Sequence, residues 1–282
     1  GTSVFAPTYK IIIGDAGFNA TSLQINRVTQ SGRRTPITLE LSGSALLNIA
    51  NSTFGEETDF IAPQISFVNN TFDNVARITK TGAVNNSNGG NTFNDSVRIT
   101  NASSANLYFS NGNADTYNGD ATFVRTGSGT FDPVYNREVE FKKNIAVEGS
   151  ANIVFNSTVT GIVKLSGDSV QEILSNSTQK AYIRNLKVDK NTAYPVVLST
   201  PVDISSNGTL TLSRGIVKTD TTNILTLLNN ASANMGSANA FVDGLLNYQM
   251  TAATTRTLNF PIGSGSDYHP LSLTVRHNAA TN

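Results

Sequence analysis

The chain contains no cysteine and no tryptophan, and only two of its 282 residues are histidine. Without cysteine there can be no disulfide, no thiol catalysis and no cysteine-ligated metal site. The two histidines, His269 and His277, lack the HxxxH or HxH spacing of histidine metal sites, and no nucleophile elbow accompanies them. We therefore expect neither a histidine-based metal centre nor a catalytic triad.

Charge is also scarce, because Asp, Glu, Lys and Arg make up 14% of the residues against a typical value of about 25%. Twenty basic residues balance twenty acidic ones, so no basic field exists to attract nucleic acid or an anionic membrane. No apolar run approaches the roughly 20 residues that span a bilayer. The sequence therefore predicts no nucleic-acid partner, no membrane insertion and no cofactor.

Small polar residues fill the composition, with 34 Asn and 22 Gly. Since β-branched and aromatic residues recur throughout, the composition is not that of a disordered chain. It suits many short strands joined by tight turns, where Asn, Gly and Ser tolerate left-handed backbone geometry. The chain begins at Gly1 without Met or a signal peptide, and we expect it to be an excerpt of a longer, processed polypeptide.

One phrase recurs five times between residues 52 and 141. Its copies are Thr53-Phe54-Gly55, Thr71-Phe72-Asp73, Thr92-Phe93-Asn94, Thr116-Tyr117-Asn118 and the looser Val134-Tyr135-Asn136. A second apolar residue follows each aromatic residue by six positions: Phe60, Ile78, Ile99, Phe123 and Phe141. The aromatic residues are 18, 21, 24 and 18 positions apart, and periods of about 20 residues indicate a solenoid.

The repeat predicts an all-β fold, a right-handed parallel β-helix (β-solenoid). Short strands at this spacing also suit a sandwich or barrel, but neither has a reason to restate one phrase. In a solenoid each residue lies above its equivalent in the coil below. We therefore expect the aromatic residues to form a core stack rather than a sugar-binding platform, with Asn ladders at the corners. The stack would contain Phe54, Phe72, Phe93, Tyr117 and Tyr135.

Three segments are expected along the chain. Residues 1–50 would form N-terminal β coils or a cap, because terminal repeats are atypical. Residues 51–250 would form the β-helix repeats. Residues 251–282 would form a terminal coil or the start of a following β domain. Right-handed coiling is expected from the usual handedness of parallel crossovers.

Five longer motifs carry a resemblance to a known group of proteins. They are the segments 91–101 (NTFNDSVRITN), 115–120 (DTYNGD), 204–216 (ISSNGTLTLSRGI), 241–244 (FVDG) and 260–263 (FPIG). Over roughly residues 50–275 the chain resembles the very large secreted surface proteins of Bacteroidota that the type IX secretion system exports, some of them gliding or attachment adhesins. The C-terminal sorting domain usual in that group is not found in this sequence.

The resemblance implies an extracellular, cell-surface-attached protein. Its partners would be the outer-membrane secretion and surface machinery during export, and extracellular polysaccharide or other surfaces afterwards. In that group of bacteria, O-glycans are attached where Asp precedes Ser or Thr and then a small or aliphatic residue. The matching triplets are Asp95-Ser96-Val97, Asp168-Ser169-Val170 and Asp220-Thr221-Thr222, so the candidate O-glycosylation residues are Ser96, Ser169 and Thr221.

Carboxylates are the remaining candidates for chemistry, since β-helix polysaccharide lyases and hydrolases use clusters of them. The groups are Glu56-Glu57 with Asp59, Glu138 and Glu140 with Arg137, and Asp115 with Asp120. The pair Glu138 and Glu140 alternates with apolar residues, which indicates the solvent face of a strand. The run from Asn111 to Asp115 starts like a calcium loop but continues with Thr instead of Gly.

The leading hypothesis is a non-catalytic extracellular β-solenoid, a stalk or adhesin segment of a very large surface protein and a type IX secretion cargo. The alternative is a β-helix carbohydrate-active enzyme or polysaccharide-binding module. A groove with three or more convergent carboxylates and a basic residue would favour the enzyme.

Overall fold

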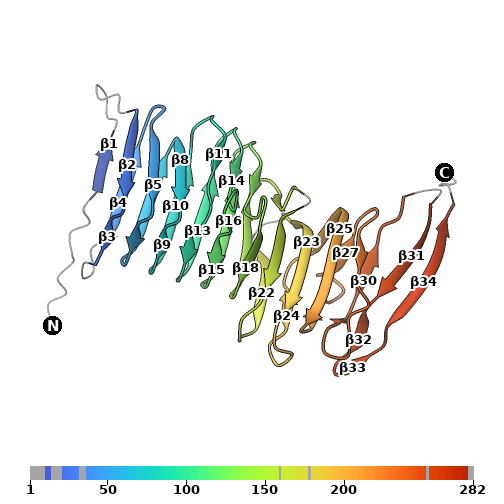
Figure 1. Ribbon diagram of the computed structural model, residues 1–282. Coiled ribbons are helices and arrows are strands. Elements are labelled where there is room, and N and C mark those ends of the chain that lie inside the picture. The colour runs from blue at the N-terminus through green and yellow to red at the C-terminus, as the bar shows by residue number, and fades with distance from the viewer. Residues whose placement is uncertain are drawn as a thin grey trace.

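The chain folds into a β-solenoid of about ten turns, seen along its length in Figure 1. The computed structural model describes residues 10–13, 21–31, 36–158, 160–176, 179–251 and 254–278. Every regular element in these ranges is a strand, and they hold no helix long and apolar enough to cross a membrane. The predicted all-β solenoid is confirmed; its handedness stays a prediction.

One continuous sheet of 13 strands, sheet 1, runs the length of the solenoid and is parallel except for the last strand. Its strands are, in spatial order, β1 (Lys10–Ile13), β4 (Ile37–Leu41), β7 (Thr58–Ala62), β10 (Ala76–Lys80), β13 (Val97–Asn101), β16 (Ala121–Arg125), β19 (Ile145–Gly149), β22 (Gln171–Ser175), β24 (Val196–Leu198), β26 (Val217–Lys218), β29 (Val242–Asp243), β32 (Ile262–Ser264) and β33 (Asp267–Tyr268). Strands from before residue 50 (β1 and β4) and from after it (β7 onward) belong to the same uninterrupted sheet 1.

A second long sheet, sheet 2, lies on another side of the coils. It contains β3 (Thr29–Gln30), β6 (Thr53–Phe54), β9 (Thr71–Phe72), β12 (Thr92–Phe93), β15 (Thr116–Tyr117), β18 (Glu138–Phe141), β21 (Ile162–Leu165), β23 (Ala181–Asp189), β25 (Val202–Arg214), β27 (Leu225–Leu227) and β30 (Leu246–Tyr248), with β20 (Ile153–Phe155) and β28 (Ser232–Ala233) paired beside it. Because consecutive members come from consecutive coils, each coil pairs with its neighbours along the rod.

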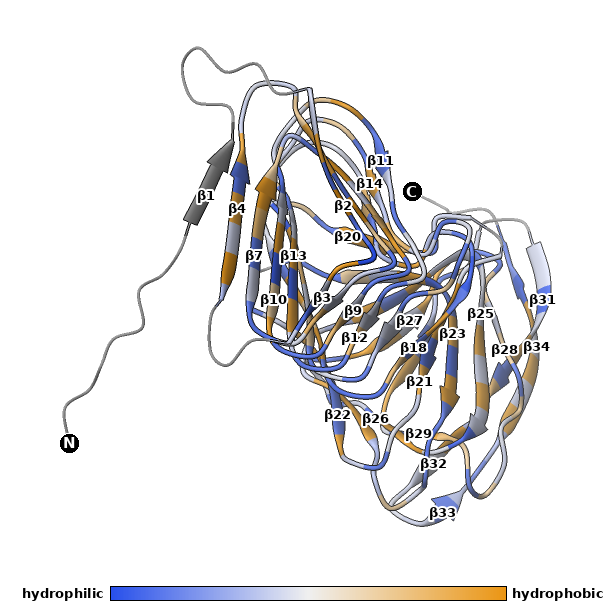
Figure 2. Cartoon of the chain, turned by 60° about the vertical axis from the view of Figure 1, so that its left-hand side comes forward, coloured by the Kyte–Doolittle hydropathy of each residue, from blue (hydrophilic) through white to orange (hydrophobic). Residues whose placement is uncertain are grey.

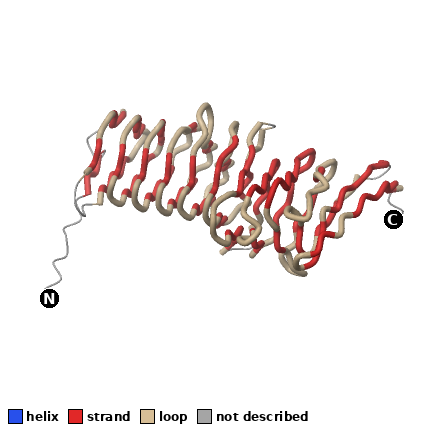
Figure 3. Tube along the Cα trace, turned by 60° about the horizontal axis from the view of Figure 1, so that its bottom comes forward, coloured by secondary structure: helices blue, strands red, loops and turns tan. Residues whose placement is uncertain are grey.

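The third side is built from shorter sheets and is the least regular. Two three-stranded sheets form it: β2 (Ser22–Asn26), β5 (Leu46–Ala50) and β8 (Gln64–Val68), then β11 (Asn86–Ser87), β14 (Leu107–Tyr108) and β17 (Phe131–Asp132). At the far end two strands, β31 (Thr254–Phe260) and β34 (Leu271–His277), pair antiparallel, with β32 and β33 of sheet 1 between them in the chain. Figure 3 shows the regular alternation of strand and loop in the first coils.

The strands form because apolar residues alternate with polar ones at the period of two that a half-buried strand requires. In β10, Ala76 and Ile78 are buried while Arg77 is exposed. The next coil repeats this pattern in register, with Ile78 opposite Ile99. Figure 2 shows the same alternation of apolar and polar residues along many strands. Tight corners between coils are made by residues such as Asn51 and Asn69, whose φ angles of 51° and 57° are left-handed.

An aromatic stack fills the core of the N-terminal coils. Phe54, Phe72, Phe93 and Tyr117 follow one another with ring centroids 5.2, 5.0 and 5.2 Å apart and planes within 15° of parallel. All four side chains are almost fully buried. The fifth ring is Phe141, stacked 4.7 Å from Tyr117.

The prediction that Tyr135 continues this stack is wrong. The residue paired with Tyr117 in the next coil is Phe141, 24 positions further along. Tyr135 lies half-buried outside the core, with its ring 4.3 Å from that of Tyr108. The second apolar column shifts accordingly, and Val147 rather than Phe141 lies opposite Phe123. The sequence is misleading in this coil for two reasons. Glu140 stands where the phrase has Thr, and Tyr135 is followed by Asn136, as the aromatic residue of the phrase is in the third and fourth copies.

Candidate functional site

A buried polar ladder runs beside the aromatic stack, one residue before each Thr of the repeated phrase. It consists of Ser52, Asn70, Asn91 and Asp115, each at most 2% exposed. The Asn70 side-chain oxygen accepts from the Ser52 backbone at 3.0 Å, and the Asn91 oxygen accepts from both the backbone (3.2 Å) and the side chain (3.0 Å) of Asn70. The ladder satisfies backbone groups that would otherwise be buried without partners.

Asp115 is the last residue of this ladder and the only acid in it. Its carboxylate accepts from Asn91 backbone and side-chain nitrogens at 2.7 and 2.9 Å, and from the Ser110 nitrogen and hydroxyl at 2.6 and 2.7 Å. Burial raises the pKa of Asp115 to about 6, against these four bonds, which favour the charged form. Because every lone pair faces protein, this carboxylate is placed to hold a coil rather than to meet a substrate.

A buried lysine occupies another inward position of sheet 1. Lys80 is fully buried, and its ammonium donates to the Ser103 hydroxyl at 2.7 Å and to the Gly82 carbonyl. Burial lowers the pKa of Lys80 to about 8. The neighbouring residue in the next coil is Asn101, which is also buried and accepts from Ser103. This cluster stabilises a corner of the coil from inside.

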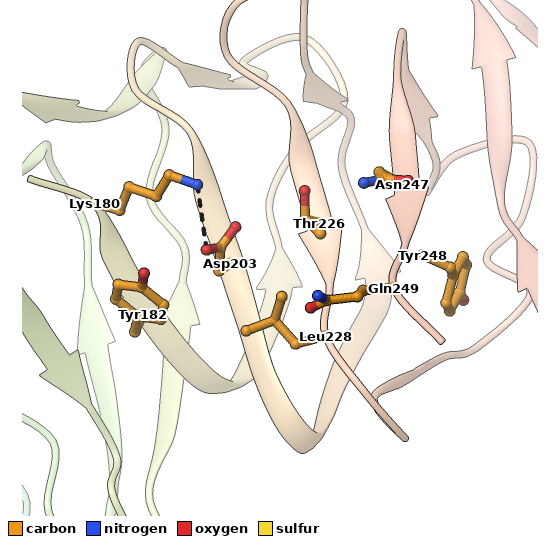
Figure 4. A pocket seen from close by; sticks show the side chains of 8 residues that line it. All are labelled: Lys180, Tyr182, Asp203, Thr226, Leu228, Asn247, Tyr248 and Gln249. Carbon is orange, nitrogen blue, oxygen red and sulfur yellow. Dashed lines mark hydrogen bonds and ion pairs between the residues drawn. The ribbon is translucent and has the colours of Figure 1, made fainter. Parts of the chain in front are cut away.

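One hollow on the described surface lies over sheet 2 in the C-terminal coils (Figure 4). It has a volume of about 550 Å³ and is lined by Lys180, Tyr182, Asp203, Thr226, Leu228, Asn247, Tyr248 and Gln249. The Lys180 ammonium lies 3.5 Å from an oxygen of Asp203, whose side chain is 7% exposed. The remaining side chains of this hollow, called the sheet 2 hollow below, are neutral.

The sheet 2 hollow also has a fixed wall. The Tyr248 hydroxyl donates to the Asn259 carbonyl at 2.6 Å, and its ring meets that of Phe260 edge-on at 4.9 Å. Burial raises the pKa of Tyr248 to about 12, so its phenol stays protonated. The Tyr248 ring thus lines the hollow on the side where it contacts β31.

A second, charged hollow of about 280 Å³ lies over β18, β21 and the C-terminal ends of β23 and β25. Three carboxylates line it, Glu140, Asp168 and Asp189, beside basic residues that include Lys164 and Arg214. Two of these carboxylates form ion pairs: Lys164 lies 3.0 Å from Glu140, and Arg214 lies 3.4 Å from Asp189. Across the described part of the chain, no three His, Asp or Glu side chains come close enough together to hold a metal ion.

The other carboxylates proposed for chemistry are dispersed. Glu138 in β18 pairs with Lys187 at 3.3 Å, and Glu57, in the corner before β7, pairs with Arg77 at 3.3 Å. Asp120 accepts from the Asn144 backbone at 3.0 Å and so links two coils. Exposed pairs of this kind contribute little to stability.

The three candidate O-glycosylation residues lie in different surroundings. Thr221 is exposed in the turn before β27, where Asp220 accepts from the backbone of Thr222 and Asn223 at 2.7 Å each. Ser169 is half-buried and its hydroxyl accepts from Lys143 at 3.0 Å. Ser96 is half-buried in the corner before β13. Of the three residues, Thr221 is therefore exposed, whereas Ser169 and Ser96 are half-buried.

The residues of the sheet 2 hollow are not among those predicted from the sequence. A signal was present in β25, where Val202 and Ile204 alternate with Asp203, since alternation places Asp203 on the outer face. The partners of Asp203 could not be found without knowing which coils are adjacent. Tyr182 and Thr226 flank it only because their strands are paired in register.

Comparison with protein-family models, with curated proteins and with solved structures finds no match to this chain.

Proposed function

We propose that the chain is a non-catalytic, extracellular β-solenoid segment of a very large cell-surface protein, serving as a stalk or adhesin and exported as a type IX secretion cargo. The supporting observation is the unbroken register of sheet 1 over about ten turns. A fold whose coils pair with adjacent coils gives length and a long lateral surface rather than one enclosed pocket. The resemblance of the five motifs to secreted surface proteins supports the location.

Internal side-chain ladders suit such a rod. The aromatic stack and the buried ladder from Ser52 to Asp115 join successive coils of the N-terminal half through their own side chains. Long-range contacts between coils resist local opening because each coil is buried between two others. A segment of this kind can present a binding surface at a distance from its anchor.

Surface labelling tests the proposal. Antibodies raised against residues 36–278 should label intact, unpermeabilised cells of the source bacterium, and an in-frame deletion of those residues should reduce attachment to surfaces. A strain lacking type IX secretion should retain the protein inside. Labelling that requires permeabilisation of wild-type cells would rule the proposal out.

Polysaccharide processing is a second candidate, favoured by one observation: the charged hollow collects Glu140, Asp168 and Asp189 beside Lys164 and Arg214. A carboxylate pair could supply general acid and base for glycoside cleavage. The test is release of new reducing ends from a panel of neutral and acidic polysaccharides. Activity that disappears in Glu140→Gln and Asp189→Asn would establish it, whereas activity unchanged in both variants would come from elsewhere.

A further inference from the structure

We infer that the sheet 2 hollow binds a neutral polysaccharide chain lying along the axis of the rod. This inference rests on the proposed function, because only a segment facing the outside of the cell would meet such a ligand. It adds to that function a site, a ligand class and a direction of binding. The argument comes from the register, hydrogen bonding and charge of the residues that line the hollow.

Four lining residues form one column across four successive strands of sheet 2. Tyr182 in β23 pairs with Asp203 in β25, Asp203 with Thr226 in β27, and Thr226 with Asn247 in β30. Adjacent strands are about 4.8 Å apart, so the column extends roughly 14 Å along the rod. A short stretch of an extended polymer could contact all four residues, and a polymer would fit the repeating rungs better than a compact ligand.

The polar groups of this column have hydrogen-bonding capacity that the protein does not use. Among the described residues, the Tyr182 hydroxyl, the Thr226 hydroxyl and the Asn247 amide have no hydrogen-bond partner. Asp203 is 5% exposed, yet its only side-chain partner there is Lys180, at 3.5 Å through one of its two oxygens. A nearly buried carboxylate with a free oxygen beside a hollow is a strong acceptor for a ligand hydroxyl.

Outward-facing polar side chains in the N-terminal coils bond one another. Unused hydrogen-bonding groups are therefore a local property of the column from Tyr182 to Asn247. In the N-terminal coils the outward side chains that directly follow the short strands of sheet 2 bond one another: Asn94 donates to Asp73 at 2.6 Å and Asn118 donates to Asn94 at 2.7 Å. Such a self-satisfied ladder offers little to a ligand. The column from Tyr182 to Asn247 has no comparable internal bonds among the described side chains.

The mixture of surfaces in the hollow suits a sugar. A sugar ring has an apolar face and a rim of hydroxyls that both donate and accept hydrogen bonds. Tyr182 offers a half-buried aromatic ring and Leu228, two strands further along, an apolar side chain (Figure 4), while Asp203, Thr226 and Asn247 offer the polar partners. The volume of about 550 Å³ lies within the range of small-molecule sites.

Charge selects a neutral ligand over an acidic one. The single cation of the hollow, Lys180, lies 3.5 Å from the single anion, Asp203. Uronate, sulfate or phosphate groups would have to compete with Asp203 for that ammonium and would meet its carboxylate as a like charge. Hydroxyls can bond to both partners without separating them.

Affinity electrophoresis in gels containing a soluble polysaccharide tests the inference. The probes are three neutral polymers (laminarin, galactomannan and xyloglucan) and two acidic ones (alginate and polygalacturonate). We expect at least one neutral polymer to retard residues 1–282, with an affinity that Tyr182→Ala and Asp203→Asn each lower about tenfold or more. Tyr182→Phe keeps the ring and should lower it less.

Tyr194→Ala is the matched control, because Tyr194 is 38% exposed in the loop before β24 and outside the hollow. Its affinity should equal that of the wild type, and unchanged thermal unfolding would show that each variant is folded. Retardation by none of the neutral polymers, equal loss in Tyr194→Ala and Tyr182→Ala, or binding confined to the acidic polymers would overturn the inference. The surface location tested by antibody labelling would stand in each of these cases.

Discussion

The N-terminal half of the described chain (residues 36–158) and the C-terminal half (residues 160–278) hold their coils together in different ways. In the first half, most strands of sheet 2 have two residues, as β9, β12 and β15 do, and supply few backbone hydrogen bonds. The aromatic stack and the ladder ending at Asp115 add contacts at this place. In the second half, β23 and β25 are 9 and 13 residues long and pair along most of their length.

This difference explains where surface chemistry can be placed. Where strands are short, polar side chains are needed to fix the register, and they bond one another across coils. In the long strands β23 and β25 the backbone fixes the register, and an outward side chain such as Tyr182 is left with unused hydrogen-bonding groups. We therefore assign the structural role mainly to the first half and the ligand site to the second.

The largest effect is expected in the aromatic stack. Phe93 lies between Phe72 and Tyr117, with ring centroids 5.0 and 5.2 Å away. Phe93→Ala should lower the free energy of unfolding by about 3–5 kcal/mol, because it leaves a cavity between two rings. Tyr135→Ala, outside the stack, should cost about 1 kcal/mol or less. Urea denaturation measures both; equal losses would contradict the register described here.

The buried ladder gives the next effect. Asn91→Ala removes the acceptor of two Asn70 nitrogens and the side-chain donor to Asp115, so about 2–4 kcal/mol should be lost as buried groups go unpaired. The matched variant is Asn94→Ala, three residues away in the exposed ladder, which should cost less than about 1 kcal/mol. Similar destabilisation of the two variants in thermal unfolding would show that burial of the ladder has no special importance.

Asp115 makes the first half sensitive to pH. Because burial raises its folded-state pKa to about 6, from an ordinary value of 3.8, the folded protein binds this proton more tightly than the unfolded chain does. Its contribution to stability is therefore fully present below pH 4 and is lost as the pH rises through 6, by at most about 3 kcal/mol. Asp132 shifts in the same direction, also through burial.

The test compares urea unfolding of wild type and Asp115→Asn across this pH range. The variant lacks the titrating group, so the difference between the two free energies should change steadily between about pH 4 and 6 and level off above it. Asp120→Asn, on the surface, is the control and should follow the wild type. A difference independent of pH would mean that Asp115 remains ionised throughout, held by its four hydrogen bonds.

Tyr117→Phe should raise the free energy of unfolding slightly. The Tyr117 hydroxyl is buried and has no hydrogen-bond partner among the described residues, whereas the equivalent residues in other coils are Phe. Removing an unsatisfied hydroxyl while keeping the ring should stabilise the protein by about 1 kcal/mol. Differential scanning calorimetry would detect the rise in melting temperature. A fall would indicate that a water or another group satisfies the hydroxyl.

The sequence predicts the solenoid and most of the stack because both depend on residues repeated at nearly fixed spacing. It fails at Tyr135 for a physical reason: in the fifth coil Val139 replaces the ladder residue and Glu140 replaces Thr, so the phrase is altered where Phe141 still stacks. The sheet 2 hollow is not visible in the repeat at all. Its residues share no motif, and only the pairing of β23 with β25 and β27 brings them together.

Glycosylation should have the smallest effect on stability. It also allows a site in the C-terminal half to be compared directly with one in the N-terminal half. If Asp-Ser/Thr triplets of this chain are modified, accessibility of the hydroxyl should decide the order. Thr221, in the C-terminal half, is exposed on a turn held by Asp220. Ser96, in the N-terminal half, is half-buried at a corner, and the hydroxyl of Ser169 accepts from Lys143. We expect glycan occupancy to be highest at Thr221.

Glycopeptide mass spectrometry of protein from the source bacterium measures that occupancy. Thr221→Ala should abolish the glycan there and change the free energy of unfolding by less than about 0.5 kcal/mol, because the residue packs against nothing buried. Lys143→Ala should raise occupancy at Ser169 by freeing its hydroxyl, and it leaves Thr221 as an internal reference. Greater occupancy at Ser96 than at Thr221 would contradict the expectation that exposure of the hydroxyl decides the order of modification.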